Sequence, residues 1–210
     1  MDEMYTSEAI KLLKNEHESG MDRVKQRRDI EKYFTIDFWK NLSQYELFNK
    51  SVSKDIKTIL DVGCHIGLLD VLYSEIGEVT AIDISERGLN YAKQYAKQYN
   101  KNIIFRLGLF ETMTFTQKYD LVILSHIIEH TYDPKRMIDK AIELCNKKII
   151  IAVPLGECLN DPTHKHWWYK FEQLLNIIDL NKVKVIYKEI CRGKELHLIL
   201  EKINETGDKK

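Results

Sequence analysis

An acid and two glycines stand close together near residue 60, in a pattern suited to binding a small ligand. Asp61 lies in the apolar run Ile59–Val62, and Gly63 and Gly67 follow it, four residues apart. A strand, a tight glycine turn and a helix start bring backbone N–H groups against a ligand, because glycine permits that close approach. Asp61 would repel a pyrophosphate, and the first close glycine pair of a Gly-x-Gly-x-x-Gly fingerprint is missing. The segment therefore favours a cationic, non-phosphorylated nucleoside.

A second acid, Asp83, follows the short apolar run that begins at Glu78, sixteen positions after Gly67. A carboxylate at the carboxyl end of such a strand can accept both ribose hydroxyls of a nucleoside. The alternative role is an N-cap for a helix beginning at Glu86, but Ser85 is better placed for that role. We therefore predict that Asp83 binds ribose.

Imidazole and carboxyl groups gather directly after the apolar run that ends at Leu124, as Ser125, His126, Glu129 and His130. If a helical turn begins at His126, residues 126, 129 and 130 share one face. His126 is then suited to deprotonating a hydroxyl or amine, with a pKa near 6 to 7, the ordinary imidazole range. The alternative is that Glu129 and His130 bond to each other or to backbone and only shape the pocket.

A polar loop after Val153 carries two histidines and two tryptophans, His164, His166, Trp167 and Trp168. Loops at the carboxyl end of a strand often carry function. We expect Trp167 or Trp168 to stack on a sugar or another ring. The alternative is that both tryptophans pack beneath the N-terminal segment.

The elements that must position these residues alternate between strand and helix patterns. Strands are predicted at 56–62, 78–83, 102–107, 119–124, 148–153, 183–190 and 195–201, and helices at 68–76, 86–98, 134–145 and 171–178. This alternation predicts an α/β fold with a doubly wound, mostly parallel seven-stranded sheet. The last two strands, joined through Gly193, are predicted to form an antiparallel edge hairpin.

Length and composition predict a single cytoplasmic domain over residues 1–210. The 32 basic and 32 acidic side chains balance, which gives no general attraction for nucleic acid or for an anionic membrane. The four cysteines are scattered, as in proteins with reduced thiols, and no apolar run is long enough to span a bilayer. Residues 1–50 are predicted to form a helical cap, either a lid or simple packing, and residues 204–210 a frayed tail.

The segment Asp61-Val-Gly-Cys-His-Ile-Gly67 resembles the first motif, Asp-x-Gly-x-Gly-x-Gly, of the class I S-adenosylmethionine-dependent methyltransferases. His65 stands at the middle glycine, where we expect it to crowd the methionine end of the cofactor. The resemblance covers residues 57–200 and implies S-adenosyl-L-methionine as the cofactor. The cofactor-binding residues implied are Asp61, Gly63, Cys64, His65, Gly67, Asp83, Ile84, Leu109, Phe110 and Ser125.

The stretch 105–115 resembles the family's Gly-Asp-x-Glu-x-Leu-Pro-Phe segment, aligned on Gly108, Glu111 and Phe115. Leu109 replaces the aspartate that contacts the adenine amino group in the family. Adenine would then be held by the backbone N–H of Phe110 and by apolar contact. One lost hydrogen bond weakens binding by perhaps ~1 kcal/mol.

The resemblance extends to the small-molecule, quinone- and sugar-type branch of the family, which has Leu-Glu-His after the fourth strand. It implies methyl transfer to an oxygen or nitrogen of a small-molecule acceptor such as a sugar, a nucleotide-sugar or a natural-product hydroxyl. His126, Glu129 and His130 are the predicted catalytic residues, and His164, His166 and Trp167 are the predicted substrate-binding residues. No metal is predicted, and a nucleic-acid partner is disfavoured.

Two alternatives remain open at this point. His126, Glu129, His130 and His164 or His166 resemble the Glu-x-x-Glu-His…His set of small-RNA 3′-terminal ribose methyltransferases, which hold a divalent ion. The replacements at His65 and Leu109 instead suggest a cofactor-binding regulatory or scaffold protein without catalysis.

Overall fold

The computed structural model describes residues 5–25, 35–157 and 161–203 of the chain. It divides into two compact units, Met1–Thr114 and Phe115–Lys210. The predicted single domain, with residues 1–50 as a cap, stays a prediction. The expected frayed tail at 204–210 lies outside the described residues, as does Cys158. The other three cysteines are free and buried.

The first unit begins with helices that pack on one another and on later helices. They are α1 (Ser7–Lys25), α3 (Ile36–Lys40) and α4 (Ser43–Ser51). Thr35 caps α3, because its hydroxyl accepts a hydrogen bond from Phe38 N at 3.3 Å. Helix α1 packs on α6 and α3 packs on α5, so the helices of this unit cover the region around the glycine loop's own helix.

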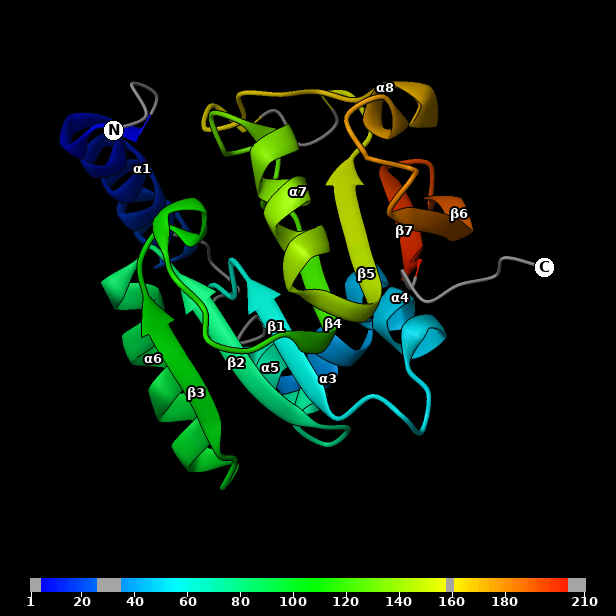
Figure 1. The fold of residues 1–210 in the computed structure, drawn as a ribbon. Helices are drawn as coiled ribbons and strands as arrows, with labels where there is room; N and C mark the ends of the chain where they lie inside the picture. The colour runs from blue at the N-terminus through cyan, green and yellow to red at the C-terminus, as the bar shows by residue number, and fades with distance from the viewer. Residues whose placement is uncertain (1–4, 26–34, 158–160, 204–210) are drawn as a thin grey trace. The chain divides into compact units, whose positions relative to one another are not determined.

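The sheet of the first unit has three parallel strands in the order β3-β2-β1. The strands are β1 (Thr58–Val62), β2 (Glu78–Asp83) and β3 (Ile103–Leu107), and the helices between them are α5 (Leu68–Tyr73) and α6 (Glu86–Gln98). Figure 1 shows α6 alongside β3. Val62 pairs with Ile82, so β1 and β2 end at the same level. Parallel strands thus bring their carboxyl-end residues together at one edge.

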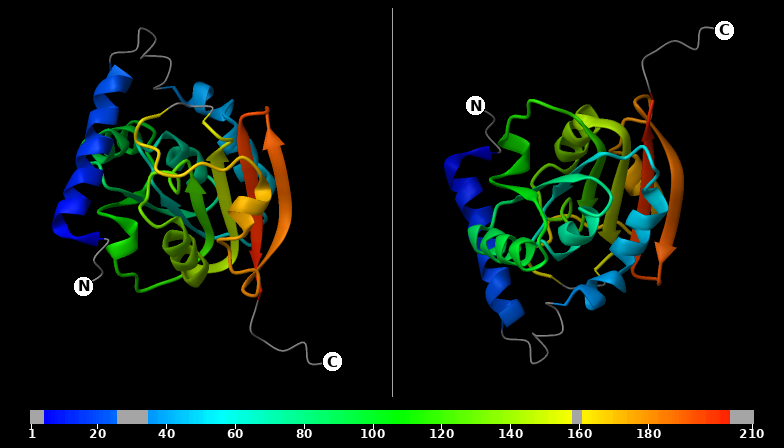
Figure 2. Two further views of the ribbon diagram at one scale, coloured as in Figure 1. Left: turned by 90° about the horizontal axis from the view of Figure 1, so that it is seen from above. Right: turned by 90° about the horizontal axis from the view of Figure 1, so that it is seen from below.

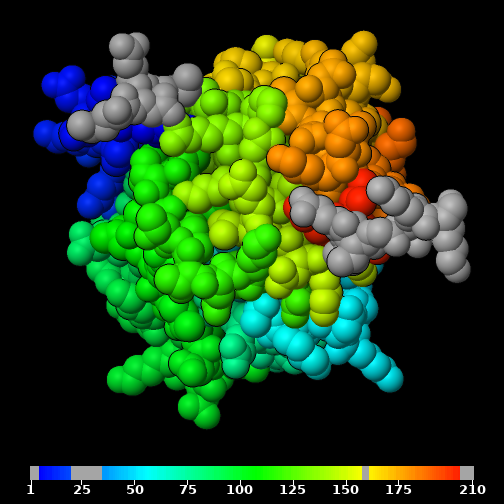
Figure 3. All heavy atoms as spheres, in the orientation of Figure 1, coloured from blue at the N-terminus to red at the C-terminus, as the bar shows by residue number. Residues whose placement is uncertain are grey.

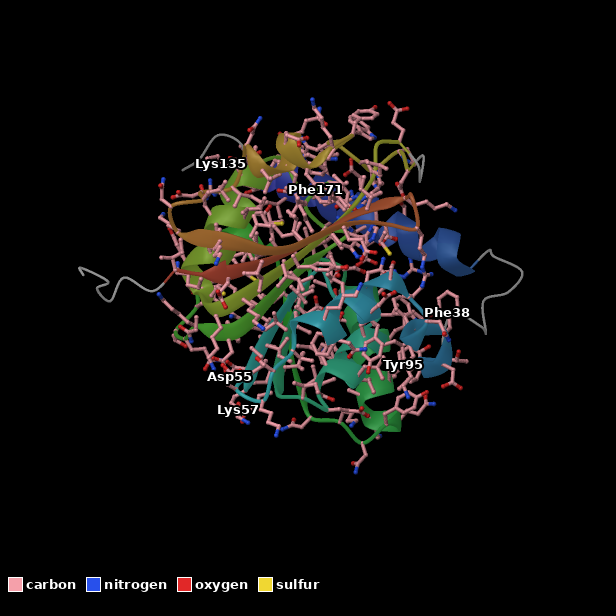
Figure 4. The ribbon with its side chains drawn as sticks, turned by 90° about the vertical axis from the view of Figure 1, so that its right-hand side faces the viewer. Phe38, Asp55, Lys57, Tyr95, Lys135 and Phe171 are labelled. Carbon is pink, nitrogen blue, oxygen red and sulfur yellow. The ribbon has the colours of Figure 1, made fainter. Side chains whose placement is uncertain are left out.

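The turn that leads into β1 shows how burial alternates at the start of this sheet. Asp55 and Lys57 are exposed and point outward (Figure 4), whereas Ile56 between them is buried. Such alternation is what an entering strand requires when one face is covered.

The second unit has four strands in the order β4-β5-β7-β6. Its elements are β4 (Tyr119–Ser125), α7 (Pro134–Leu144), β5 (Cys145–Pro154), α8 (Phe171–Leu175), β6 (Val183–Cys191) and β7 (Glu195–Lys202). Strands β4 and β5 are parallel, and β7 is antiparallel to both β5 and β6. Strands β6 and β7 lie side by side in both views of Figure 2. Their turn has positive φ at Arg192 and Gly193, as type I′ hairpins require.

Helix α7 shows why these residues form these elements. Pro134 occupies the first turn, and the Asp133 carboxylate accepts a hydrogen bond from Arg136 N at 2.9 Å. Buried Ile138 and Ile142, four residues apart, pack toward β4 and β5, and the opposite face lies at the surface (Figure 3). Seven strands with an antiparallel final hairpin confirm the predicted α/β class. Among the described helices, none combines the length and apolar character needed to cross a membrane.

Candidate functional site

The glycine loop between β1 and α5 is closed by its own backbone. Gly63 N and Cys64 N both donate to Ile82 O, at 2.8 and 3.0 Å, and Gly67 N donates to Cys64 O at 2.9 Å. Gly63 and Gly67 have φ of 79° and 72°, a region that favours glycine. A Cβ at Gly67 would stand 2.5 Å from the Cβ of Ala92 in α6. This glycine is therefore required both by its backbone conformation and by close helix packing.

Asp83 is the acceptor on which this loop converges. Its Oδ2 accepts the backbone N–H of His65 at 2.8 Å, and its Oδ1 accepts that of Ser85 at 2.7 Å. The side chain is buried at the carboxyl end of β2. Ser85 Oγ caps α6 by accepting Gly88 N at 2.9 Å, which confirms that Ser85 rather than Asp83 is the cap. Each carboxylate oxygen retains a lone pair for a further donor.

His65 adopts a positive φ of 54° at the position where the family motif has glycine. Histidine tolerates this region at a modest cost. Its side chain is half-buried, and burial lowers the pKa of the imidazole more than the charge of Asp83 raises it. The residue thus contributes a backbone donor and an uncharged ring to the loop.

Asp61 is buried at the end of β1, beside a second buried acid that the sequence analysis did not single out, Asp70 in α5. Burial raises the pKa of Asp61 to about 7; hydrogen bonding with Asp70 opposes this rise, and the charge of Asp83 adds to it. Burial also raises the pKa of Asp70 well above its ordinary value, reinforced by Asp61. An acid between the buried apolar residues Leu68 and Val71 was the available sequence signal.

The predicted adenine segment forms a short 3₁₀ helix, Phe110–Thr112, after β3. Gly108 N donates to Asp83 O at 3.0 Å, which ties this segment to the end of β2. Phe110 is buried and Leu109 is half-buried. Glu111 is buried and accepts a hydrogen bond from the Tyr5 hydroxyl at 3.2 Å. Ile84, half-buried, lies between the two acceptor contacts of Asp83 in the chain.

In the second unit, the segment after β4 is not helical. His126 has φ of 52° and its N–H donates to Ala152 O at 2.8 Å, which extends the pairing of β4 with β5. A turn follows, in which His130 N donates to Ile127 O at 3.0 Å. The expectation of a helical turn starting at His126 is therefore wrong, because the chain leaves the strand through a left-handed residue. Ser125 is the last residue of β4 and is half-buried.

The His126 imidazole lies between two carboxylates. Its Nδ1 is 3.5 Å from Glu129 Oε1, and its Nε2 is 3.6 Å from Glu195 Oε1 of β7. The other oxygen of Glu195 lies 2.7 Å from His197 Nε2. Burial alone would lower the pKa of His126, but hydrogen bonding and the charges of Glu129 and Glu195 outweigh it and raise the pKa to about 10. The expected pKa of 6 to 7 is therefore not what the structure gives.

His130 points to the loop after β5 rather than to His126. Thr163 Oγ1 donates to Asp161 Oδ1 at 2.7 Å and lies 3.0 Å from His130 Nδ1. Because the hydroxyl proton is used on Asp161, His130 Nδ1–H is the donor to Thr163 and Nε2 is the unprotonated nitrogen. The His130 and His164 rings meet edge to face with centroids 4.7 Å apart.

Glu129, His130 and His164 each offer a ligand atom, and these atoms lie within 4.8 Å of one another. Glu129 is 1% exposed, and no hydrogen-bond donor reaches either of its carboxylate oxygens in the structure. One carboxylate and two imidazoles form a chemically adequate donor set for a divalent ion.

The loop itself is held on the backbone of Glu129, whose carbonyl accepts Lys165 N at 2.7 Å and His166 N at 3.3 Å. His166 Nε2 lies 3.1 Å from Thr131 O. The two tryptophans differ. Trp168 is 5% exposed, whereas Trp167 is 43% exposed and remains accessible for a ligand, so Trp168 fits the packing alternative.

Two groups of residues thus define the class: a glycine loop closed on a strand-end acid in one unit, and a His-Glu-His turn under a histidine loop in the other. This constellation on an α/β fold is that of the S-adenosylmethionine-dependent methyltransferases. The chain belongs to the family described as "Methyltransferase domain", which it matches over residues 53–202.

Curated relatives are named for quinone chemistry. The chain is 37% identical over 90 residues to the ubiquinone biosynthesis O-methyltransferase of Coxiella burnetii, a match covering 42% of this chain and 38% of the relative. It is 28% identical over 178 residues to that of Pelagibacter ubique, covering 76% and 74%. The chain thus spans well under half the length of the first relative that it matches.

Solved structures share the fold. The N-methyltransferase NodS of Bradyrhizobium japonicum WM9, in complex with S-adenosyl-L-homocysteine, aligns with a TM-score of 0.70 at 13% identity, covering 90% of this chain and 100% of that one. Magnesium protoporphyrin IX methyltransferase of Synechocystis PCC 6803, with bound S-adenosylhomocysteine, aligns with a TM-score of 0.69 at 18% identity, covering 92% and 99%. These likenesses confirm the predicted fold class.

Proposed function

We propose that this protein transfers a methyl group from S-adenosylmethionine to an oxygen nucleophile of a small molecule that carries a ring. The observation that carries the proposal is the buried Asp83 carboxylate, which the glycine loop orients through the N–H of His65 at 2.8 Å. Family membership and the O-methyltransferase names of the relatives support the reaction type.

The residues of the first unit fit the cofactor. Asp83 retains acceptor capacity for two ribose hydroxyls beyond its two backbone bonds. Gly63 and Gly67 remove side chains where a ligand approaches the loop, and Asp61 offers a carboxyl group for a cationic ligand. When bound, the cofactor supplies an electrophilic methyl group on a sulfonium. The contribution of these residues is positioning, which accounts for much of the rate enhancement in such reactions.

The residues of the second unit would manage the acceptor and its proton. His126 stays our candidate for the base, but a pKa of about 10 leaves only about one molecule in a thousand unprotonated at pH 7. If His126 is the base, the transfer rate should therefore keep rising up to about pH 10 instead of levelling near pH 7. A rate that levels near neutrality would leave His126 as a cation that fixes Glu129 and Glu195.

The exposed ring of Trp167 supports an aromatic or sugar acceptor. The test is a panel of catechols, hydroxybenzoates, hexoses and nucleotide-sugars, scored by release of S-adenosylhomocysteine. Trp167→Ala should raise KM for the accepted compound about two- to tenfold, the usual worth of a ring contact. Tyr169→Ala, a neighbouring aromatic that is 58% exposed, is the matched control and should leave KM unchanged. Release with no member of the panel, despite cofactor binding, would refute the proposed acceptor class.

Divalent-metal-dependent methylation, of the type that acts on the 3′-terminal ribose of RNA, is the second candidate function. The buried Glu129 carboxylate beside His130 and His164 favours it. Metal analysis of the purified protein and calorimetry with Zn²⁺, Mn²⁺ and Mg²⁺ test it. Glu129→Gln should abolish binding and the exposed Glu157→Gln should not. Absence of binding at micromolar metal would remove this candidate.

A further inference from the structure

The buried acid Asp70 has no ordinary hydrogen-bond donor. Its side chain is 0% exposed, and no N–H or O–H donor reaches either Oδ1 or Oδ2. It lies beneath the glycine loop, since Oδ2 stands 3.4 Å from where a Cβ on Gly67 would be. An unsatisfied buried carboxylate is costly, so a fold that keeps one requires a compensating group.

The compensating group is the carboxyl of Asp61, with which Asp70 interacts directly. Two carboxylates carry no proton to share, so they can hydrogen-bond only when one of them is protonated. Two acids in such contact resist ionising together, because the second charge meets the first in a poorly solvated place. The pair therefore holds one proton and one negative charge.

The other titratable groups around the pair do not supply a cation. Burial raises the pKa of the Cys64 thiol and of the Tyr73 hydroxyl, so both stay neutral. Burial lowers the pKa of His65, which keeps the ring uncharged. Asp83 adds a negative charge at the end of β2, oriented by its two backbone donors. A cation would have to arrive with the ligand.

We propose that Asp70 is a positioning residue that shares one proton with Asp61, so that binding of the cationic methyl donor releases this proton and binding of the product does not. The inference rests on the proposed function. S-adenosylmethionine carries a sulfonium charge that S-adenosylhomocysteine lacks. With the donor bound, both carboxyls ionise, one O–H bond breaks, and the proton leaves to solvent. With the product bound, the pair keeps its proton.

The consequence is a donor preference that depends on pH. One linked proton changes the ratio of the two dissociation constants by at most about tenfold per pH unit. The ratio of the product's constant to the donor's should rise between about pH 5.5 and 8. Below this range, the donor pays the cost of displacing the proton and loses its advantage.

The experiment is isothermal titration calorimetry of the full chain with each ligand at pH 6.5, in two buffers of different ionisation enthalpy. The wild-type protein should release up to about one proton more with S-adenosylmethionine than with S-adenosylhomocysteine. Asp70→Asn supplies an amide donor to Asp61, so the difference should vanish and the affinity ratio should become independent of pH. Comparing wild type with variant cancels protons that the ligands bind themselves.

The control is Glu75→Gln, an exposed acid just beyond α5, which should keep the wild-type proton release. Equal proton release with both ligands in the wild-type protein would overturn the inference while leaving the proposed function intact, and this reading needs no variant to fold. Release that persists in Asp70→Asn would also overturn it. Binding of neither ligand would overturn the proposed function together with the inference.

Discussion

Replacing Asp70 by asparagine should stabilise the ligand-free protein at alkaline pH and not at acid pH. The folded pKa of Asp61, about 7, lies above the ordinary value of 3.8. The native state therefore binds more protons than the unfolded state between these values, and stability falls as pH rises through that window. Asp70→Asn removes one acid and gives Asp61 a hydrogen-bond donor, so this loss should disappear.

The magnitude follows from the shift of about three pH units, at about 1.4 kcal/mol each, or ~4 kcal/mol as a ceiling. Relaxation around the charged pair reduces this, and we expect the variant to gain ~1–3 kcal/mol in free energy of unfolding at pH 8. At pH 4, where little of the penalty has developed, the two proteins should be nearly equal.

Urea unfolding at pH 4, 5, 6, 7 and 8 measures this difference, with the slope of unfolding free energy against urea checked for constancy. The difference between variant and wild type is the informative quantity, because other carboxylates add their own pH dependence to both proteins. Glu75→Gln serves again as the control and should follow the wild type at every pH. A variant that is less stable at pH 8, or a difference that is constant with pH, would refute the shared-proton reasoning.

Three further outcomes are expected. Asp83→Ala should weaken S-adenosylhomocysteine binding about tenfold or more by calorimetry, since charge-assisted hydrogen bonds contribute ~1.5–3 kcal/mol, and unchanged affinity in a folded variant would remove Asp83 from the site. Gly67→Ala should lower the free energy of unfolding by more than the ~1–2 kcal/mol that a positive φ costs, because its Cβ would meet α6 at 2.5 Å; Gly193→Ala, at φ 67° with nothing within 4 Å, should lose only that backbone cost, and equal losses would contradict the packing argument. In metal-free protein, NMR titration should show His126 protonated at pH 8 and losing its proton near pH 10, so its stabilising contribution persists above pH 6.5 and fades through pH 10, whereas Glu195→Gln should bring the midpoint lower and an unchanged midpoint would contradict the assigned cause.

The sequence predicted elements best where local chemistry and periodicity agree. Helix α6 begins at Glu86 and ends at Gln98 as predicted, because Ser85 caps it and its apolar residues recur on one face. Helix α8 stops at Leu175, three residues before the predicted end, since a short periodic run does not fix its own C-terminus. The sequence also predicted the hairpin through Gly193, whose turn residues carry their own conformational signal.

The charges around His126 were beyond local reasoning. Glu195 lies on β7, almost seventy residues along the chain, and meets His126 because the antiparallel return of β7 pairs Glu195 with Pro154 at the end of β5. No spacing rule connects these residues. The raised pKa of His126 is thus a product of sheet topology, and a base assignment made from residue type alone lacks the quantity that decides it.

The replacement at His65 is explained by which atoms of the loop do the work. The position contributes its backbone N–H, which donates to Asp83 Oδ2, and a positive φ of 54°. Glycine meets both requirements without strain, and histidine meets them with a cost of roughly 1–2 kcal/mol. His65→Gly should therefore keep the hydrogen bond and leave S-adenosylhomocysteine affinity equal or higher, as calorimetry would show. A large loss of affinity would mean that the imidazole itself contacts the ligand, and the backbone account of this loop would fail.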